Sequence, residues 1–356
     1  MTDVGLDDAH AQLRDLARKV FADRSPTTAI RALADDTLGF DPELWRTAAE
    51  LGFTGLEIGE EHGGAGMSFR EAAVVLDEMG RGLVPLPVLS SVVLGTGALL
   101  AAGSPAQQAE WLPAMAAGER RLAVAIGPDR HDVRVAGDRL HGSAPFVLDA
   151  HAADGLVVQA GGKLYLVPLP ASGVTVTPAP MLDRTRRLAD VAFDGAEVEP
   201  MPGSTDGASV VDWLLDRAAA ALALDSHGGA RRAMEISVEY AKERVQFDRP
   251  IGSFQAVKHK CADMLIAVET TRVAADAAAR DVAPRPDGPR RWPSIAKAHA
   301  TDAYAFVAGA GISVHGGIGF TWEHDMHLFV KRAKLDQALF GTPAFHRERY
   351  ARLLLD

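Results

Sequence analysis

The amino-acid sequence predicts an α+β protein that is mostly α-helical, with a β domain between two helical domains. Apolar residues recur at helical spacing near both ends of the chain, and short segments rich in Val and Leu occupy its middle. Helices and strands are segregated rather than alternating, which disfavours a doubly wound parallel sheet. We therefore expect an N-terminal helical domain over residues 1–118, a β domain over 119–205 and a C-terminal helical domain over 206–356.

In the N-terminal region, residues 13–20 carry apolar side chains at i, i+3, i+4 and i+7, which is the pattern of an amphipathic helix. Ser68 precedes Glu71 by three residues ahead of the apolar run 72–76, and this spacing predicts a helix that begins with a capping box. Ser104-Pro105 predicts the start of a later helix.

Six segments of the middle region are expected to form strands, because they are short and separated by Gly, Pro and Asp. Their spacing is typical of a small antiparallel barrel or sandwich. The segments are Leu122–Ile126, Arg139–Phe146, Gly155–Ala160, Lys163–Val167, Gly173–Pro178 and Leu188–Phe193.

After residue 210 the sequence again shows patterns that are typical of helices. An apolar stripe over residues 257–268 predicts a helix and places Cys261 in the core. The Ala- and Gly-rich run 218–233 would let helix backbones approach closely. Residues 284–293 are rich in Pro and Arg and are expected to form an exposed loop.

Composition excludes several classes of protein. The chain has 356 residues and a formal net charge of −10, which argues against a sequence-independent nucleic-acid binder. The single cysteine excludes an internal disulfide and a Cys-based metal site. The acidic start does not resemble a signal peptide, and the apolar stretch 85–102 is too short and interrupted to span a bilayer. We expect a soluble, cytoplasmic protein without nucleic-acid or membrane partners.

Two segments could bind a ligand. The run His315–Phe320 contains three glycines; it is either a turn at a helix C-terminus or a place where a cofactor approaches the backbone. The run Arg244–Gln255 gathers Arg, Gln and aromatic residues; it is either an ordinary loop between helices or a site for a pyrophosphate. No metal site is expected, because Glu323–His327 is more typical of a polar helix N-terminus. A nucleophile elbow of the G-x-S-x-G type is absent from the sequence.

Together these motifs resemble the acyl-CoA dehydrogenase family, especially its shorter actinobacterial members that form heteromeric complexes. The resemblance runs nearly end to end. It rests on residues 44–81 in the N-terminal region, on Asp183–Arg186, which resembles a strand of the family's middle domain, and above all on Arg244–His259 and His315–Asp325.

The resemblance implies a helical domain, a β-barrel or sandwich domain and a C-terminal four-helix bundle, with FAD stretched across a subunit interface. It implies oxidation of an acyl-CoA thioester, with electrons leaving through an electron-transfer flavoprotein. Carried over by position, five residues would contact the ADP or pyrophosphate end of a neighbouring subunit's FAD: Arg244, Gln246, Phe247, Ile251 and Gln255. Gly316 and Gly317 would let another part of the same FAD approach the backbone.

The departures from the family pattern concern the catalytic base. The family commonly places a Glu where this chain has Phe340, and an alternative base position corresponds to Ala218. Asp216 is a weak substitute, because two residues turn a helix by about 200°. The stretch 126–130 is short where relatives carry a longer polar loop. No residue of this chain is therefore assigned as catalytic.

Three hypotheses remain open. The chain could be one subunit of an α2β2 acyl-CoA dehydrogenase whose paralogous partner supplies the base. It could be a self-sufficient homo-oligomeric flavoenzyme with an atypical base, or a non-redox scaffold on the same fold. The resemblance to mixed-complex relatives points to lipid or steroid catabolism, with bulky CoA thioesters as substrates.

Overall fold

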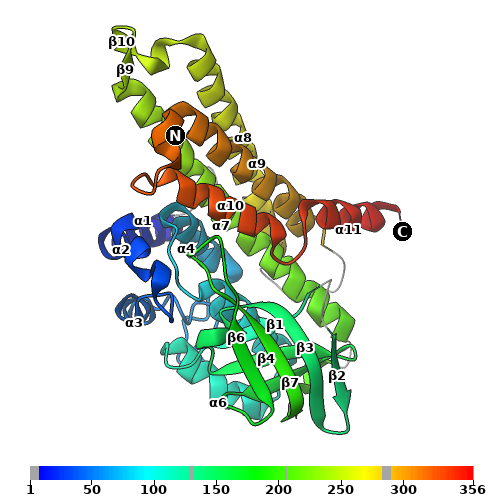
Figure 1. Ribbon diagram of the computed structural model, residues 1–356. Coiled ribbons are helices and arrows are strands. Elements are labelled where there is room, and N and C mark those ends of the chain that lie inside the picture. Colours follow the sequence, from blue (N-terminus) through cyan, green and yellow to red (C-terminus); the bar gives the residue numbers. More distant parts are fainter. Residues whose placement is uncertain (1–7, 128–131, 205–206, 283–289, 356) are drawn as a thin grey trace.

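The computed structural model describes residues 8–127, 132–204, 207–282 and 290–355, and Figure 1 shows strands gathered below a long helical bundle. Most of the expected loop at 284–293 lies outside the described residues, and Pro293 belongs to a helix instead. Much of the shortened stretch at 126–130 lies outside them as well.

The N-terminal region is helical, as predicted. Its α-helices are α1 (Asp8–Arg24), α2 (Thr27–Ala32), α3 (Pro42–Glu50), α4 (Phe69–Gly82), α5 (Thr96–Ala102) and α6 (Pro105–Ala116), with a π-helix η3 (Val88–Gly95) before α5. The capping box of Ser68 and Glu71 begins α4, and a second one, of Ser104 and Gln107, begins α6. Short 3₁₀ turns are η1 (Leu33–Asp35), η2 (Glu60–His62), η4 (Ala150–Ala152) and η5 (Pro202–Ser204).

The middle region is a sandwich of two four-stranded sheets. One sheet has the order β1 (Leu122–Ala125), β4 (Gly155–Ala160), β5 (Lys163–Pro168), β8 (Glu199–Pro200). The other has the order β2 (Asp132–Ala136), β3 (Arg139–Leu148), β7 (Leu188–Glu197), β6 (Val174–Pro178). Apolar side chains of both sheets form one core. All six expected strands are present, but the expected antiparallel pairing is wrong for β1 and β4, which are parallel.

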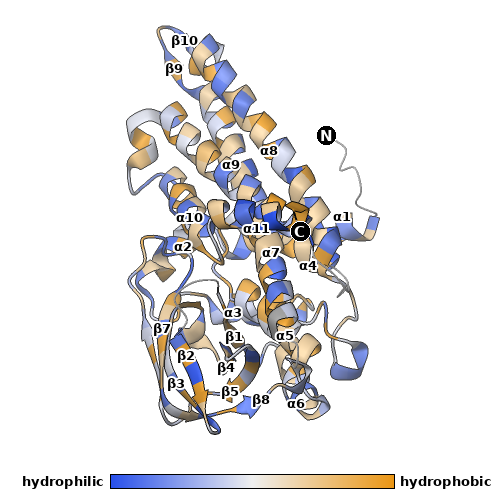
Figure 2. Ribbon diagram, turned by 90° about the vertical axis from the view of Figure 1, so that its right-hand side faces the viewer, coloured by the Kyte–Doolittle hydropathy of each residue, from blue (hydrophilic) through white to orange (hydrophobic). Residues whose placement is uncertain are grey.

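The C-terminal region consists of α7 (Gly207–Glu243), α8 (Gln255–Val282), α9 (Trp292–His315), α10 (Met326–Ala338) and α11 (Pro343–Leu355). By length and composition α9 could cross a membrane, but it packs against α7, α8, α10 and α11 and is largely buried. Figure 2 shows the bundle ending in a projecting tip that carries β9 and β10.

The stripe on α8 is less buried than its sequence pattern indicates. Met264 and Val268 are buried, whereas Leu265 is exposed. Cys261 is half-buried, and this partial burial raises the pKa of its thiol. The assignment of Cys261 to the core is therefore wrong, because the stripe winds away from the bundle at this end of α8.

Helix α7 connects the parts of the molecule. Its 37 residues span about 56 Å at about 1.5 Å per residue, from the middle region to the tip. A Cβ atom at Gly228 would lie 1.9 Å from the carbonyl oxygen of Asp77, and one at Gly80 would lie 2.0 Å from that of Asp225. The backbones of α4 and α7 therefore touch, as the Ala- and Gly-rich run predicts.

Candidate functional site

The segment Arg244–Gln255 forms the tip of the bundle. Val245–Gln246 (β9) and Arg249–Pro250 (β10) pair as a short antiparallel ribbon, and a 3₁₀ turn, η6 (Ile251–Ser253), leads into α8. The two residues between the strands, Phe247 and Asp248, have φ values of +52° and +61°. Left-handed backbone suits a two-residue hairpin, but it is unfavourable for a Phe by about 1–2 kcal/mol.

The side chains of the tip point away from the rest of the chain. The Phe247 ring is 85% exposed, and Arg244, Gln246 and Gln255 are exposed as well, whereas Ile251 is partly buried. No hydrogen bond or ion pair joins the Arg244 guanidinium to another residue in the described ranges. The Phe247 ring packs edge to face on the ring of Phe254, with 6.0 Å between the centroids, but most of Phe247 stays exposed, so the tip can contact another molecule.

The glycine segment lies at the same end of the bundle. The ring of His315 stacks on that of Tyr240 with 4.5 Å between the centroids, and Tyr240 is one helical turn before Arg244. Gly316 ends α9 with φ +67°, which confirms the interpretation as a helix C-terminal turn. A Cβ atom at Gly316 or Gly317 would meet nothing within 4 Å. Their backbone therefore faces open space, so the cofactor interpretation stays compatible with the turn.

The histidines beyond this turn form no metal site. Within the described part of the chain, no group of three His, Cys, Asp or Glu side chains gathers to hold a metal. Asp325 instead accepts hydrogen bonds from Arg31 at 2.7 Å and Thr27 at 3.0 Å, which ties the start of α10 to α2. Burial lowers the pKa of His315, whose Nδ1–H donates to the Gly311 carbonyl at 2.8 Å.

The two base positions lie at the other end of the bundle and carry no carboxylate. Ala218 is fully buried in α7. Phe340 has φ +52° in the turn between α10 and α11, and its carbonyl accepts a hydrogen bond from Nε2 of His346 at 3.1 Å. Nζ of the buried Lys297 donates to the Gly341 carbonyl at 3.1 Å, and burial lowers the pKa of Lys297 to about 8. Hydrogen bonds from the buried side chains of His346 and Lys297 thus hold the backbone of this turn.

Asp216 is not a free carboxylate. It is 3% exposed and accepts a hydrogen bond from Arg349, and Arg290 lies 3.6 Å away. Burial raises the pKa of Asp216, although the two guanidinium groups oppose this effect. The weak substitute for the base is therefore enclosed in an ion-paired group.

A buried ion pair beside Ala218 was not foreseen from the sequence. Arg217 donates to Glu57 at 2.9 Å and to the Val93 carbonyl at 3.0 and 3.1 Å. Its guanidinium lies 4.9 Å from the ring centre of Phe69 and 4.8 Å from that of Trp213. Arg217 and Glu57 are 2% and 7% exposed. The side chain next to the alternative base position therefore fills the space between α7 and the N-terminal helices.

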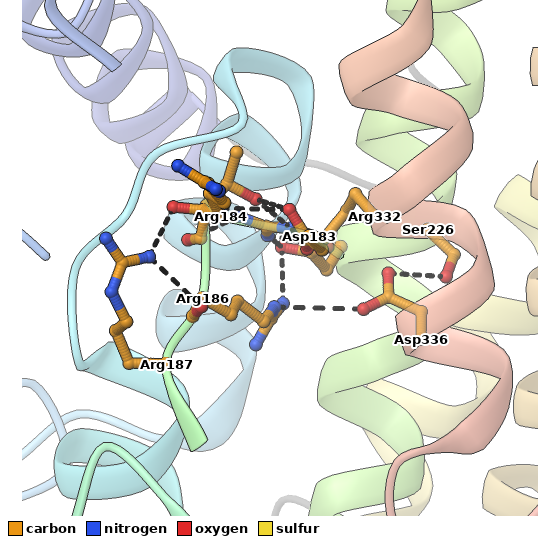
Figure 3. A network of polar contacts seen from close by, with 9 residues as sticks. Asp183, Arg184, Arg186, Arg187, Ser226, Arg332 and Asp336 are labelled. Atoms are coloured by element: carbon orange, nitrogen blue, oxygen red, sulfur yellow. Dashed lines mark hydrogen bonds and ion pairs between the residues drawn. The ribbon is translucent and has the colours of Figure 1, made fainter. Parts of the chain in front are cut away.

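Asp183–Arg186, expected on a strand, lies instead in the loop between β6 and β7. There it takes part in the polar network of Figure 3, together with α7 and α10. Arg332, which is 1% exposed, lies 3.2 Å from Asp183 and 3.1 Å from Asp225. Arg186 lies 2.9 Å from Asp225 and 3.8 Å from Asp336.

The protonation of this network follows from its surroundings. Burial and repulsion by Asp225 raise the pKa of Asp336 well above its ordinary value. Burial alone would raise the pKa of Asp225 too, but Arg186 and Arg332 outweigh it and lower that pKa. With Asp336 neutral, the charges of two arginines and two aspartates cancel. The network therefore joins the middle region to the C-terminal region without an excess buried charge.

Comparison with known proteins gives consistent matches along the chain. Residues 7–119 match the acyl-CoA dehydrogenase N-terminal domain, and residues 205–355 match the acyl-CoA dehydrogenase C-terminal domain. The chain is 35% identical to the acyl-CoA dehydrogenase IpdE2 of Mycolicibacterium smegmatis over 96% of both proteins. It is 37% identical to IpdE2 of Mycobacterium tuberculosis, over 93% of this chain and 92% of that protein.

Solved structures agree in fold. The ChsE4-ChsE5 complex of Mycobacterium tuberculosis contains a chain that is 29% identical, with a TM-score of 0.91 over 100% of this chain and 99% of that chain. A variant of the Tcur3481-Tcur3483 steroid ACAD is 28% identical, with a TM-score of 0.89 over 98% of each chain. Each of these two names joins two differently named proteins.

Proposed function

The chain belongs to the acyl-CoA dehydrogenase family, and from this premise we propose that it is the subunit of a two-chain complex that supplies the outer part of a flavin site. The family makes it a flavoprotein oxidoreductase whose cofactor is FAD. In the proposed complex the partner subunit supplies the base and most of the acyl-CoA pocket. The observation that carries the proposal is that the exposed tip follows the C-terminal end of α7, whereas Ala218 lies in the first third of α7.

The tip and the alternative base position at Ala218 are too far apart along α7 to act on the same flavin. Ala218 and Arg244 are 26 residues apart, which is about 39 Å at about 1.5 Å per residue. This is longer than an extended FAD molecule. A flavin whose outer end is held by the tip therefore cannot reach Ala218 of the same chain, and the tip would serve a flavin whose reactive ring lies on another subunit.

The residues of the tip fit the outer end of FAD. The Arg244 guanidinium has the planar fork that binds a pyrophosphate through two parallel hydrogen bonds. The exposed ring of Phe247 offers an apolar face, and the open backbone at Gly316 and Gly317 admits a close approach. Gln246 and Gln255 add exposed amide groups. These side chains would bind and orient the cofactor.

The base positions do not fit the removal of a proton from a thioester. When bound, FAD accepts the hydride that leaves the β carbon of the substrate. The proton at the α carbon needs a carboxylate that is free to accept it, and Asp216 and Glu57 are both held by arginines. Phe340 and Ala218 cannot accept a proton, so this chain contributes no catalytic residue in the proposal.

The relatives support the finer parts of the proposal. The ChsE4-ChsE5 and Tcur3481-Tcur3483 structures are named as pairs, and the latter is named as a steroid enzyme. We propose an α2β2 heterotetramer with a paralogous subunit, a bulky acyl-CoA thioester of lipid or steroid catabolism as substrate, and an electron-transfer flavoprotein as electron acceptor. Its place would be the cytoplasm.

The experiment combines native mass spectrometry with FAD determination on the chain purified alone and together with a co-expressed paralogue. The complex is expected to hold one FAD for each pair of chains, and the chain alone is expected to be poor in FAD. Arg244→Gln should weaken FAD binding by the complex about tenfold, the effect of losing one charge-assisted contact. Lys242→Gln, in the last turn of α7 and also exposed, is the matched control and should change nothing.

A stable, yellow homo-oligomer of this chain that is bleached by an acyl-CoA would overturn the proposal and favour a self-sufficient enzyme. Full FAD content in the Arg244→Gln complex would show that the tip does not bind the flavin.

A further inference from the structure

A pocket of about 110 Å³ lies between the N-terminal helices and the bundle. Its walls come from α1, α4, α7 and α8. His227 of α7 lines this pocket, nine residues after Ala218. At about 100° per residue, nine residues place the two side chains on opposite faces of the helix. The pocket therefore lies on the face of α7 opposite Ala218, and its described lining includes neither Phe340 nor a residue of the tip.

A buried aspartate and histidine form the polar part of the pocket. Asp77 accepts a hydrogen bond from Nδ1 of His227 and another from Arg231 at 2.8 Å. Burial alone would raise the pKa of Asp77, but the positive charge of Arg231 and the contact with His227 outweigh it and hold that pKa well below its ordinary value. Asp77 is therefore an anion that fixes a proton on Nδ1 of His227.

The other ring nitrogen of His227 has no partner. His227 is 5% exposed, and its Nε2 atom makes no hydrogen bond to any residue in the described ranges. Buried polar atoms in folded proteins are almost always hydrogen-bonded, so this nitrogen indicates a missing contact. Because Nδ1 is turned to Asp77, Nε2 on the other side of the ring can donate when the ring is protonated and accept when it is neutral.

Most charged side chains that line the pocket are paired with a neighbour of opposite charge, but one arginine is not. Arg231 is paired with Asp77 and Glu78, and Arg272 is paired with Glu269 at 3.2 Å. The other polar groups of the lining are engaged as well: His10 contacts Glu71, Arg14 lies near Asp15, and Asp276 is paired with Arg280.

Arg70, in the first turn of α4, is the exception. Its guanidinium makes no hydrogen bond or ion pair with a residue in the described part of the chain. Among the residues that the structure describes, the pocket therefore offers the guanidinium of Arg70 and Nε2 of His227, and Nε of the otherwise paired Arg231 is also without a hydrogen bond.

The rest of the lining is apolar. Val74, Leu224 and Ala279 are each at most 8% exposed and line the pocket beside the charged groups. The volume admits several water-sized groups, which suits a short aliphatic segment and not a nucleotide. The ligand chemistry that matches both parts is an anionic head group on a short apolar body.

We propose that this pocket binds a small organic anion, a carboxylate or a phosphate monoester on a short aliphatic chain, through Arg70 and Nε2 of His227. Arg70 contributes charge-assisted hydrogen bonds to the head group. His227, held in orientation by Asp77, contributes the second contact. Val74, Leu224 and Ala279 cover the aliphatic part.

The test is isothermal titration calorimetry on the full chain, or on its complex with the partner subunit, with hexanoate, butyl phosphate and hexylammonium as probes. One or both anions should bind, and hexylammonium should not. Arg70→Gln is expected to weaken binding about tenfold. Arg232→Gln is the matched control, because Arg232 lies next to Arg231 on α7 but outside this pocket, and it should leave the affinity unchanged.

A second measurement guards against a variant that fails to fold. In the unmodified protein, titration with the bound anion should shift the ¹⁵N resonance of Nε2 of His227, and this result does not depend on the stability of any variant. Stronger binding of butyl phosphate would identify a phosphate ligand, and stronger binding of hexanoate a carboxylate.

The proposal is overturned if neither anion binds at millimolar concentration, if hexylammonium binds as well as they do, or if Arg70→Gln binds like the unmodified protein. An unchanged Nε2 resonance at saturation would remove His227 from the site.

Discussion

The two ends of the bundle differ in how their polar groups are satisfied. At the tip, Arg244 and Phe247 are exposed, and Phe247 has a positive φ and an edge-to-face ring contact with Phe254. Around Ala218, the charged groups are buried and paired, as Arg217 with Glu57 and Asp216 with Arg349. The polar groups of the tip are free to bind another molecule, whereas the charged groups around Ala218 are paired with one another. The same helix therefore joins an outward-facing binding surface to a closed interior.

The largest expected effect is a loss of stability at the end of the bundle around Ala218, which we call the closed end. Arg217→Met leaves Glu57 buried without its partner and should lower the free energy of unfolding by about 3–5 kcal/mol, measured by urea denaturation. The double variant Arg217→Met/Glu57→Leu should recover most of this loss, because an apolar pair can replace a buried ion pair. At the other end, Phe247→Ala should change the unfolding free energy by less than about 0.5 kcal/mol.

If Arg217→Met lowers the free energy of unfolding by less than about 1 kcal/mol, the pair of Arg217 and Glu57 behaves like an exposed ion pair and not like a buried one. Equal losses for Arg217→Met and Phe247→Ala would remove the contrast between the two ends.

An intermediate effect concerns acid stability at the closed end. Burial, with the nearby charge of Lys297, lowers the pKa of His346 from its ordinary value of 6.5 to about 3. The folded protein therefore resists protonation of His346, and its contribution to stability is present above pH 6.5 and is lost as the pH falls toward 3. Between about pH 6 and pH 4 the loss should approach 1.4 kcal/mol per pH unit.

The comparison is the slope of unfolding free energy against pH. His346→Gln should remove about one proton from that slope, whereas His299→Gln, at an exposed position on α9, should keep it. Identical slopes in the two variants would show that His346 is not held neutral by burial.

The smallest expected effect sharpens the description of the tip. Gly316 has φ +67°, so Gly316→Ala should destabilise the fold by about 1 kcal/mol. Gly317 does not have a positive φ, and its added Cβ would meet nothing, so Gly317→Ala should change stability by less than about 0.5 kcal/mol. If FAD approaches this backbone, Gly317→Ala should still lower the FAD content of the complex. Unchanged FAD content would place the cofactor elsewhere.

The sequence predicts local structure well where neighbours in the chain determine it. The capping box at Ser68, the helix start at Ser104-Pro105 and the six expected strands depend on residues a few positions apart, and all of them form. Strand β2 escaped prediction because its residues are half-exposed and carry no buried apolar run. The parallel pairing of β1 and β4 escaped because the order of strands in a sheet is set by long-range packing.

The candidate site divides in the same way. The tip was found because Arg244–Gln255 and His315–Phe320 are continuous motifs, although their roles stay a prediction. The pair of Arg217 and Glu57 was not found, because its members are 160 residues apart and neither belongs to a motif. The pocket at His227 was missed for the same reason, since its walls come from four helices that only the fold brings together.

The uninterrupted length of α7 has a consequence for which sequence changes the protein can accept. Inserting one residue between Ala218 and Arg244 would rotate the tip by about 100° and move it by about 1.5 Å relative to the rest of the molecule. Substitutions in this stretch alter single contacts, but insertions and deletions would misalign every contact of the tip at once. The hairpin turns at Gly137 and Gly161, where an added Cβ meets nothing, carry no such restriction. Variation in length should therefore accumulate in the middle region and be absent between residues 218 and 244.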